Sequence, residues 1–162
     1  MDRVFLGLGS NLGDRDEYLR AGIRGLASRD IDIIRRASVY STEPLEVVNQ
    51  PWFLNTVIEI QTNLPPRDLL ALCLEVEKEN GRARDTAKGP RTLDIDVLFY
   101  GNAIIRDSAL TIPHPNFSSR RFVLAPLAEI APDFIDPVSG KNIRQILSDC
   151  SDPSVVLLAG QI

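Results

Sequence analysis

Residues 54–62 read Leu-Asn-Thr-Val-Ile-Glu-Ile-Gln-Thr, and this stretch sets the pattern from which the fold can be predicted. Thr56, Ile58 and Ile60 fall on one side of an extended chain, because successive side chains of a strand point to opposite faces. The residues between them fall on the other side. Since β-branched residues favour strands, we expect one strand of a sheet here.

Strand and helix patterns alternate on both sides of this stretch. After it, Pro65-Pro66 opens a helical pattern that ends at Gly81, since proline suits the first helical turn and glycine suits the end of a helix. Before it, Asp14 and Glu17 have the spacing of a capping box at the start of a helix. In chain order we expect a strand at Val4–Leu8, a helix at Arg15–Ser28, strands at Ile31–Tyr40 and Leu54–Thr62, the helix after Pro65-Pro66, and a strand at Leu93–Tyr100.

This order predicts the fold class. Strand, helix, strand, strand, helix, strand is the ferredoxin-like βαββαβ arrangement, an α+β fold with helices packed on one face of an antiparallel sheet. As C-terminal additions we expect a short strand pair within Ala103–Ile112 and short helices at Phe122–Ile130 and Ile143–Ser148. The chain has 162 residues and shows no internal repeat or linker-like change of composition, so residues 1–162 are expected to form a single domain.

Composition limits the classes of function. The net charge of −4 and the pI of about 5.0 argue against a nucleic-acid surface, which needs a basic field. No stretch approaches the roughly 20 apolar residues of a membrane span, and the apolar run near the N-terminus is too short for a signal peptide. Cys73 and Cys150 form no C-x-x-C motif, so neither a disulfide framework nor a zinc site is expected. We therefore expect a cytoplasmic protein without a nucleic-acid or membrane partner.

Two aspartates give the strongest chemical signal. Asp94 and Asp96 lie two residues apart on an expected strand, so their carboxylates project to the same side, while Ile95 and Val97 face the other. Neighbouring carboxylates repel unless a cation lies between them, and Mg²⁺ prefers a few carboxylates together with phosphate oxygens and water. The alternative is a pair of solvated aspartates on an edge strand. We expect an interior strand here, which favours metal binding.

A run of basic residues precedes the aspartates. In an acidic protein this local reversal of sign predicts an anion site, because the planar arginine side chain suits phosphate oxygens. A solvated loop paired with nearby acidic residues is the alternative. Metal-binding carboxylates beside arginines are typical of phosphoryl or pyrophosphoryl transfer. The run comprises Lys78, Arg82, Arg84, Lys88 and Arg91.

Other motifs are weaker. His114, the single histidine, lies between two prolines, where a loop can direct it towards a ligand. Gly7, Gly9 and Gly13 do not have the G-x-G-x-x-G spacing, and no G-x-x-x-x-G-K-[ST] motif is present, so known phosphate loops are not indicated. We interpret the three glycines as allowing a tight strand-to-helix turn.

Six motifs in order resemble one enzyme family. They are Gly7-Leu8-Gly9-Ser10-Asn11-Leu12-Gly13, Tyr40-Ser41-Thr42-Glu43-Pro44, Gln50-Pro51-Trp52-Phe53-Leu54-Asn55, Gly81-Arg82, Gly89-Pro90-Arg91-Thr92-Leu93-Asp94-Ile95-Asp96 and Pro113-His114-Pro115. Over about residues 4–148 the chain resembles 6-hydroxymethyl-7,8-dihydropterin pyrophosphokinase of the folate pathway. The resemblance implies transfer of the pyrophosphoryl group of ATP to the hydroxymethyl group of the pterin, with release of AMP. Lys88 and Leu74 depart from the aromatic and polar residues common in the family.

The resemblance also implies the roles of individual residues. The implied catalytic residues are Asp94, Asp96, Arg82 and Arg91, and the two aspartates are implied to hold two magnesium ions. The residues implied to bind ATP are Glu77, Arg82, Arg84, Arg91, Val97, Leu110, Thr111, His114 and Arg120. Those implied to bind the pterin are Thr42, Pro44, Leu45, Phe53, Asn55 and Phe122, with the pterin ring between Phe53 and Phe122.

Two other classes of function remain open at this stage. A ferredoxin-like RNA-binding module shares the topology, but it needs exposed aromatic residues on its central strands and a basic face. A non-catalytic pterin-binding protein would have a damaged aspartate pair or arginine set, and here these residues are intact. We expect small-molecule substrates as the partners, and a monomer.

Overall fold

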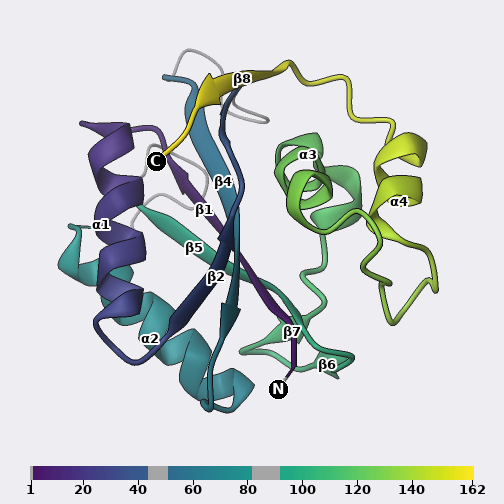
Figure 1. The fold of residues 1–162 in the computed structure, drawn as a ribbon, viewed down its shortest axis with the longest axis horizontal. Coiled ribbons are helices and arrows are strands. Elements are labelled where there is room, and N and C mark those ends of the chain that lie inside the picture. Colours follow the sequence, from purple (N-terminus) through teal and green to yellow (C-terminus); the bar gives the residue numbers. More distant parts are fainter. Residues whose placement is uncertain (1, 44–50, 82–91) are drawn as a thin grey trace.

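The structure is a computed structural model that describes residues 2–43, 51–81 and 92–162. Its main sheet is antiparallel and six-stranded (Figure 1). The strand order is β5-β1-β4-β3-β8. β2 and β3 both pair with the same edge of β4, one with each half of it. The strands are β1 (Val4–Ser10), β2 (Asp32–Arg36), β3 (Val39–Thr42), β4 (Phe53–Gln61), β5 (Asp94–Tyr100) and β8 (Val156–Gly160).

Helices cover both faces of the sheet. Figure 1 shows α1 and α2 on one face and α3 and α4 on the other. The first pair and the strands β1–β5 confirm the expected ferredoxin-like core. The second pair are the expected C-terminal additions, and they cover the face that the βαββαβ core alone leaves open. The helices are α1 (Arg15–Ala27), α2 (Pro66–Glu79), α3 (Arg121–Ile130) and α4 (Ile143–Asp149).

Each side of the sheet has its own apolar core. The core under α1 and α2 includes Leu6, Ile58 and Leu69, all fully buried. The core under α3 is aromatic: the Phe5 and Phe134 rings meet edge to face with centroids 4.9 Å apart. Since odd- and even-numbered residues of β1 and β4 enter different cores, the alternation seen in the sequence corresponds to two buried faces.

The expected strand Ile31–Tyr40 is interrupted. β2 pairs with the end of β4 (Asp32 opposite Gln61), and β3 pairs with its beginning (Tyr40 opposite Asn55). At the break, the Ser38 amide and hydroxyl both donate to the Glu129 carboxylate of α3, at 3.0 Å each to Oε2. At Ser38, a polar contact with α3 therefore replaces regular pairing between strands.

β5 is an edge strand, and the expectation that the two aspartates lie on an interior strand is wrong. Its other side meets α2 instead of a further strand. The Ile95 amide donates to Glu77 Oε2 of α2 at 2.7 Å, and most β5 residues are buried by the helical layers on both faces. The apolar composition that indicated an interior strand reflects this covering by helices.

The smaller features predicted from the sequence are confirmed in part. Asp14 Oδ1 accepts from the Glu17 amide at 3.2 Å, whereas the Glu17 carboxylate accepts from Arg24. β6 (Ile105–Arg106) and β7 (Thr111–Ile112) form the expected short pair, followed by the 3₁₀ helix η1 (Phe117–Ser119). β8 had no counterpart in the expected elements. Among the described residues, every helix is too short or too polar to span a membrane.

Candidate active site

Asp94 and Asp96 lie on the α3 side of β5, as their spacing predicts. Ile95 and Val97 point the other way, into the core under α1 and α2. Both aspartates remain partly exposed. In the neighbouring strand β1, Gly9 lies opposite Asp94 and Gly7 lies opposite Asp96. The carboxylates therefore border a strip of sheet that carries no side chains.

The two glycines belong to the strand, and their interpretation as part of a strand-to-helix turn is wrong. β1 continues through both of them to Ser10, and only Gly13, with φ +72°, adopts a turn conformation. A Cβ atom on Gly9 would lie 2.6 Å from Asn55 Oδ1, which is closer than real Cβ atoms come to another atom. A Cβ on Gly7 would lie 3.5 Å from Leu98, an ordinary contact. Glycine is thus required at position 9 because the side chain of Asn55 on β4 occupies the space of a Cβ atom.

Three of the expected pterin residues lie together on this same face. Asn55 Nδ2 donates to Thr42 Oγ1 at 2.7 Å, and both residues are buried. The Phe53 ring lies 3.6 Å from the position of a Cβ on Gly9. A flat heterocycle could therefore approach an apolar ring and a paired amide and hydroxyl next to the bare strip of β1.

Phe122 and Arg120 come from the opposite helical layer. Phe122 lies in the first turn of α3, which packs on β3 and β4. The Arg120 guanidinium carbon is 5.7 Å from the centre of the Phe122 ring, within the range of a cation–π contact. The start of α3 therefore brings one aromatic ring and one cation together.

His114 connects this region to β5. Its amide donates to Leu98 O at 2.9 Å, and its Nδ1 accepts from the Asn116 amide at 3.2 Å. Burial chiefly, together with the positive charge of Arg120, lowers its pKa to about 4, while Asp94 acts in the opposite direction. At neutral pH the imidazole is therefore uncharged, with Nδ1 as acceptor and the remaining proton on Nε2, where it can be donated to an anion.

Glu77 lies beneath β5. It is 1% exposed, and its carboxylate accepts from the amide of Ile95, the residue between the two aspartates. Cys73, one turn earlier on α2, is a buried thiol; burial chiefly, with the charges of Glu77 and Asp96, raises its pKa to about 12. Glu77 therefore holds the backbone that carries the aspartates. Its expected contact with ATP stays a prediction.

The other expected residues divide into two groups. Val97 and Leu110 are buried in the core under α1 and α2, and Thr111 begins β7. Arg82, Arg84, Arg91, Pro44 and Leu45 lie outside the described residues. The expected contribution of these three arginines to the site therefore stays a prediction.

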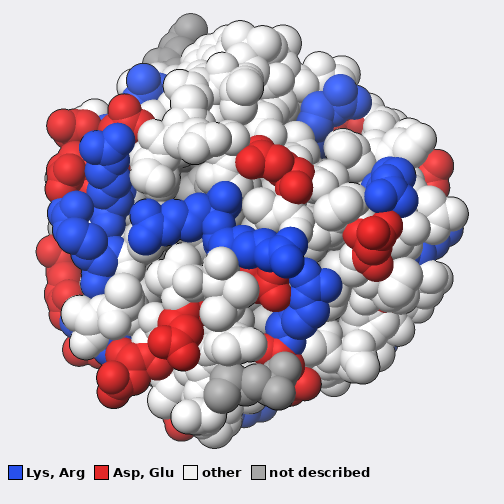
Figure 2. All heavy atoms as spheres, viewed as in Figure 1, with Lys and Arg blue, Asp and Glu red and all other residues white. Residues whose placement is uncertain are grey.

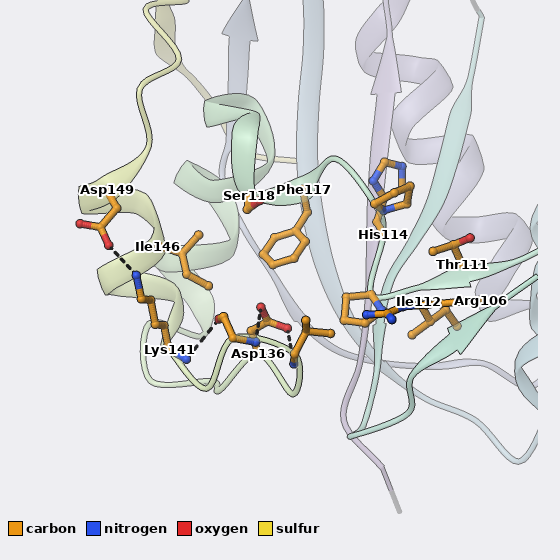
Figure 3. Close-up of a pocket in the computed structure, with 14 residues that line it drawn as sticks. Arg106, Thr111, Ile112, His114, Phe117, Ser118, Asp136, Lys141, Ile146 and Asp149 are labelled. Carbon is orange, nitrogen blue, oxygen red and sulfur yellow. Dashed lines mark hydrogen bonds and ion pairs between the residues drawn. The ribbon is translucent and has the colours of Figure 1, made fainter.

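A pocket of about 480 Å³ opens below His114 (Figure 3). Thr111 and His114 line one side, and Asp136, Lys141 and Ile146 line the side formed by α4 and the segment before it. Neither the aspartate pair nor the expected pterin residues line this pocket. It reaches the candidate site only at Thr111 and His114, and the remaining described residues of the candidate site lie outside it.

The donor set can be tested for its fit to a metal. Over residues 2–43, 51–81 and 92–162, no three His, Cys, Asp or Glu side chains converge as a metal site. Two carboxylates on one face of a strand, next to a strip without side chains, still fit magnesium, which is commonly held by one or two carboxylates together with substrate phosphates and water.

Comparison with known proteins assigns the family. A family model described as 7,8-dihydro-6-hydroxymethylpterin-pyrophosphokinase (HPPK) matches residues 5–132. This chain belongs to that family. A relative from Methylorubrum extorquens, named 2-amino-4-hydroxy-6-hydroxymethyldihydropteridine pyrophosphokinase, is 43% identical over 155 residues, which cover 95% of this chain and 96% of the relative. The protein of the same name from Bacillus subtilis is 42% identical over 128 residues, covering 78% of this chain and 77% of the relative.

Solved structures agree on the fold. A structure described as HPPK-DHPS in complex with substrates gives a TM-score of 0.74 at 14% identity over 91% of this chain. Because the identity is only 14%, that likeness supports the fold alone, and this chain spans 43% of the HPPK-DHPS chain.

His114 should make the stability of this HPPK-family chain depend on pH. The folded-state pKa of about 4 lies below the ordinary value of 6.5, so the unfolded chain binds more protons between these values. The stabilisation is complete above pH 6.5 and is lost as the pH falls towards 4. The free energy of unfolding of the wild type should fall between pH 7 and 4.5. In His114→Gln this fall should be smaller by about 1–2 kcal/mol, a value that allows for the partial exposure of the His114 side chain. Urea unfolding at both pH values measures this, and equal losses in both proteins would contradict the prediction.

Proposed function

We propose that this chain transfers the pyrophosphoryl group of ATP to the hydroxymethyl group of 6-hydroxymethyl-7,8-dihydropterin, giving the pterin diphosphate and AMP in folate biosynthesis. The observation that carries the proposal is the placement of Asp94 and Asp96 beside the strip formed by Gly7 and Gly9. The Thr42–Asn55 pair and Phe53 lie on the same face. Family membership supplies the chemistry that this arrangement would serve.

The pterin would lie against β4 and the start of α3. Its edge has hydrogen-bond donors and acceptors that the Asn55 amide and the Thr42 hydroxyl can match, and these two groups are already bonded to each other at 2.7 Å. We propose that the ring lies between Phe53 and Phe122, and that Pro44 and Leu45 complete the pocket. A buried, fixed amide favours a substrate whose polar edge fits it, because a mismatched edge would leave these groups without partners.

ATP would lie between the aspartates and the basic residues. Asp94 and Asp96 would hold magnesium, with two ions expected, and when bound the metal would lower the charge repulsion of the triphosphate and the pKa of the attacking hydroxyl. Arg82 and Arg91 would stabilise negative charge in the transition state. Glu77, Arg84, Val97, Leu110, Thr111, His114 and Arg120 would bind or surround the nucleotide.

The reaction requires positioning more than proton transfer. The pterin hydroxyl oxygen forms a bond to the β-phosphorus, the bond from that phosphorus to the oxygen bridging the α- and β-phosphates breaks, AMP departs with that oxygen, and the hydroxyl proton passes to solvent. His114 is a weak base, since its pKa is about 4. We propose that it instead donates a hydrogen bond from Nε2 to a phosphate oxygen, and that substrate alignment supplies much of the rate enhancement.

The two alternative functions are less well supported. RNA-binding modules of this topology stack bases on exposed aromatic residues of the central strands. Here β1 and β4 are almost entirely buried, and the core under α3 covers their apolar residues Phe5 and Val57 on that face. Figure 2 does show a band of basic side chains on one face, but acidic residues adjoin it, and Arg3 and Arg35 both pair with Glu59. For a non-catalytic pterin-binding protein, an intact aspartate pair would have no role.

The location and assembly follow as part of the same proposal. We propose a cytoplasmic monomer that binds small molecules and neither nucleic acid nor membranes. Free cysteines are consistent with a reducing compartment: Cys73 and Cys150 are both unpaired in the structure.

The product distinguishes this reaction from ordinary kinase chemistry. With ATP, magnesium and the reduced hydroxymethyl pterin, we expect AMP to form in equal amount with the pterin diphosphate, as measured by anion-exchange chromatography. A control without pterin should yield no AMP. Formation of ADP would mean transfer of one phosphoryl group and would contradict the proposal.

A further inference from the structure

The C-terminal segment 151–160 connects the two sides of the candidate pterin pocket. In Figure 1 it runs from α4, past α3, to the outer edge of β3, where it forms β8. Val156 pairs with Thr42 in that ladder. The HPPK family model ends at residue 132, so this segment lies outside the matched region.

Asp152 holds the first turn of α3. Its Oδ2 accepts from the Arg121 amide at 2.9 Å, and its Oδ1 accepts from the Ser154 amide at 2.9 Å. Helix amides of the first turn lack partners within the helix, and Arg120 at the N-cap position makes no side-chain capping bond. Asp152, which is 9% exposed, supplies this cap from a distant part of the chain. Burial opposes its ionisation, but the hydrogen bonds from Ser154 and Arg121, with the Arg121 charge, outweigh burial and lower its pKa.

The same segment holds the end of β3. The Glu43 amide donates to Val155 O at 3.3 Å, and the Val155 amide donates to Glu43 Oε1 at 2.8 Å. Glu43 directly follows Thr42 and precedes Pro44, so these bonds lie where the chain leaves β3 for the expected pterin loop. Three residues of the segment, 152, 155 and 156, thus contact both the Phe122 side and the Thr42 side of the pocket.

We propose that Asp152 is a positioning residue for the pterin: by capping α3 it sets the distance of Phe122 from the polar groups on β3 and β4. The inference rests on the proposed function. The far end of α3 has its own attachment, since Glu129 accepts from Ser38 and Tyr40. Loss of the Asp152 cap should therefore release the first turn without releasing the helix.

The effect should fall on the pterin more than on ATP. Phe122 and Thr42, which border the segment, are both expected pterin contacts. Arg120, the nearest expected ATP contact, lies beside the Phe122 ring, but its amide donates to Phe117 O and its carbonyl accepts from the Leu124 amide, and neither bond involves Asp152. The other expected ATP residues lie on different elements.

The test is steady-state kinetics of Asp152→Ala with each substrate varied in turn. Loss of a helix cap typically costs about 1 kcal/mol or more, so we expect the KM for the pterin to rise about five- to tenfold. The KM for ATP and kcat should change less than about twofold to threefold. The matched control is Asp149→Ala, a nearby exposed aspartate whose partner is Lys141 at 3.4 Å; it should leave all constants unchanged.

A second variant covers the case in which Asp152→Ala does not fold. Asp152→Asn keeps one acceptor oxygen and should raise the pterin KM about threefold, because the charge at the helix start is lost. A purely structural role would lower the active fraction, and thus kcat, with both KM values unchanged. If the wild-type enzyme forms AMP but the folded variants have an unchanged KM for the pterin, the positioning role is overturned. Failure of the wild type to form AMP would instead overturn the proposed function.

Discussion

Asp96→Asn should reduce AMP formation by at least about 10²- to 10³-fold while the protein stays folded. The side chain lies on the α3 face of β5, opposite Gly7, and it belongs to neither apolar core. Asparagine has nearly the same shape but no charge, so it should preserve packing and weaken the expected metal site. Because the proposed catalysis relies on stabilising the triphosphate charge, loss of one carboxylate should act on kcat rather than on the pterin KM.

The matched control is Asp32→Asn, the same substitution at an exposed position of β2 in the same sheet. It should have wild-type activity. Circular dichroism and thermal unfolding of both variants should show an unchanged fold. Normal AMP formation by folded Asp96→Asn would mean that the aspartate pair is not the catalytic metal site. Raising the magnesium concentration should recover part of the lost rate if the defect is weak metal binding.

Local periodicity was enough to predict the core of the fold. The alternation in Leu54–Thr62 and the prolines before α2 depend on interactions within a few residues, and these elements were predicted within one or two residues of their observed ends. The interruption between β2 and β3 could not be predicted in this way. It depends on Glu129, which lies 91 residues from Ser38 in the sequence.

Tertiary context also explains the expectations that were wrong. Leu93–Tyr100 has the composition of an interior strand, but helices bury it and Glu77 occupies its open edge. β8 has exposed apolar residues, with Leu157 55% and Leu158 70% exposed, so it lacks the alternation that marks a half-buried strand. Its position is determined by pairing with β3, a contact that the segment itself does not encode.

Where motifs carried the chemistry, the sequence indicated individual residues of the candidate site, and their roles stay predictions. Asp94 and Asp96 share a face because spacing in a strand determines direction, and the structure confirms that geometry. The contribution of Gly9 was missed, because a glycine in a strand gives no local sign of the side chain it must accommodate. The cross-strand neighbour Asn55 supplies that reason, and only the register between β1 and β4 reveals it.

Gly9→Ala should therefore impair pterin binding, with a smaller loss of stability. The new Cβ would lie 2.6 Å from Asn55 Oδ1, so the Asn55 amide must rotate and lose its 2.7 Å bond to Thr42. Displacing a buried polar pair costs about 1–3 kcal/mol, which corresponds to a rise of about 5- to 150-fold in the pterin KM or dissociation constant. The global stability should fall less, because replacing glycine by alanine reduces the entropy of the unfolded chain by an equivalent of about 0.4–1 kcal/mol.

Gly7→Ala is the matched control on the same strand and the same face. Its Cβ would lie 3.5 Å from Leu98 and touch no group proposed to bind the pterin, so its pterin affinity should remain within about twofold of wild type. Asn55→Ala tests the route of the effect. If Gly9→Ala acts through Asn55, the double variant should bind pterin no more weakly than Asn55→Ala alone, because coupled residues are not additive. Additive losses in fluorescence titrations would show that Gly9 instead contacts the pterin directly or supports the site by another route.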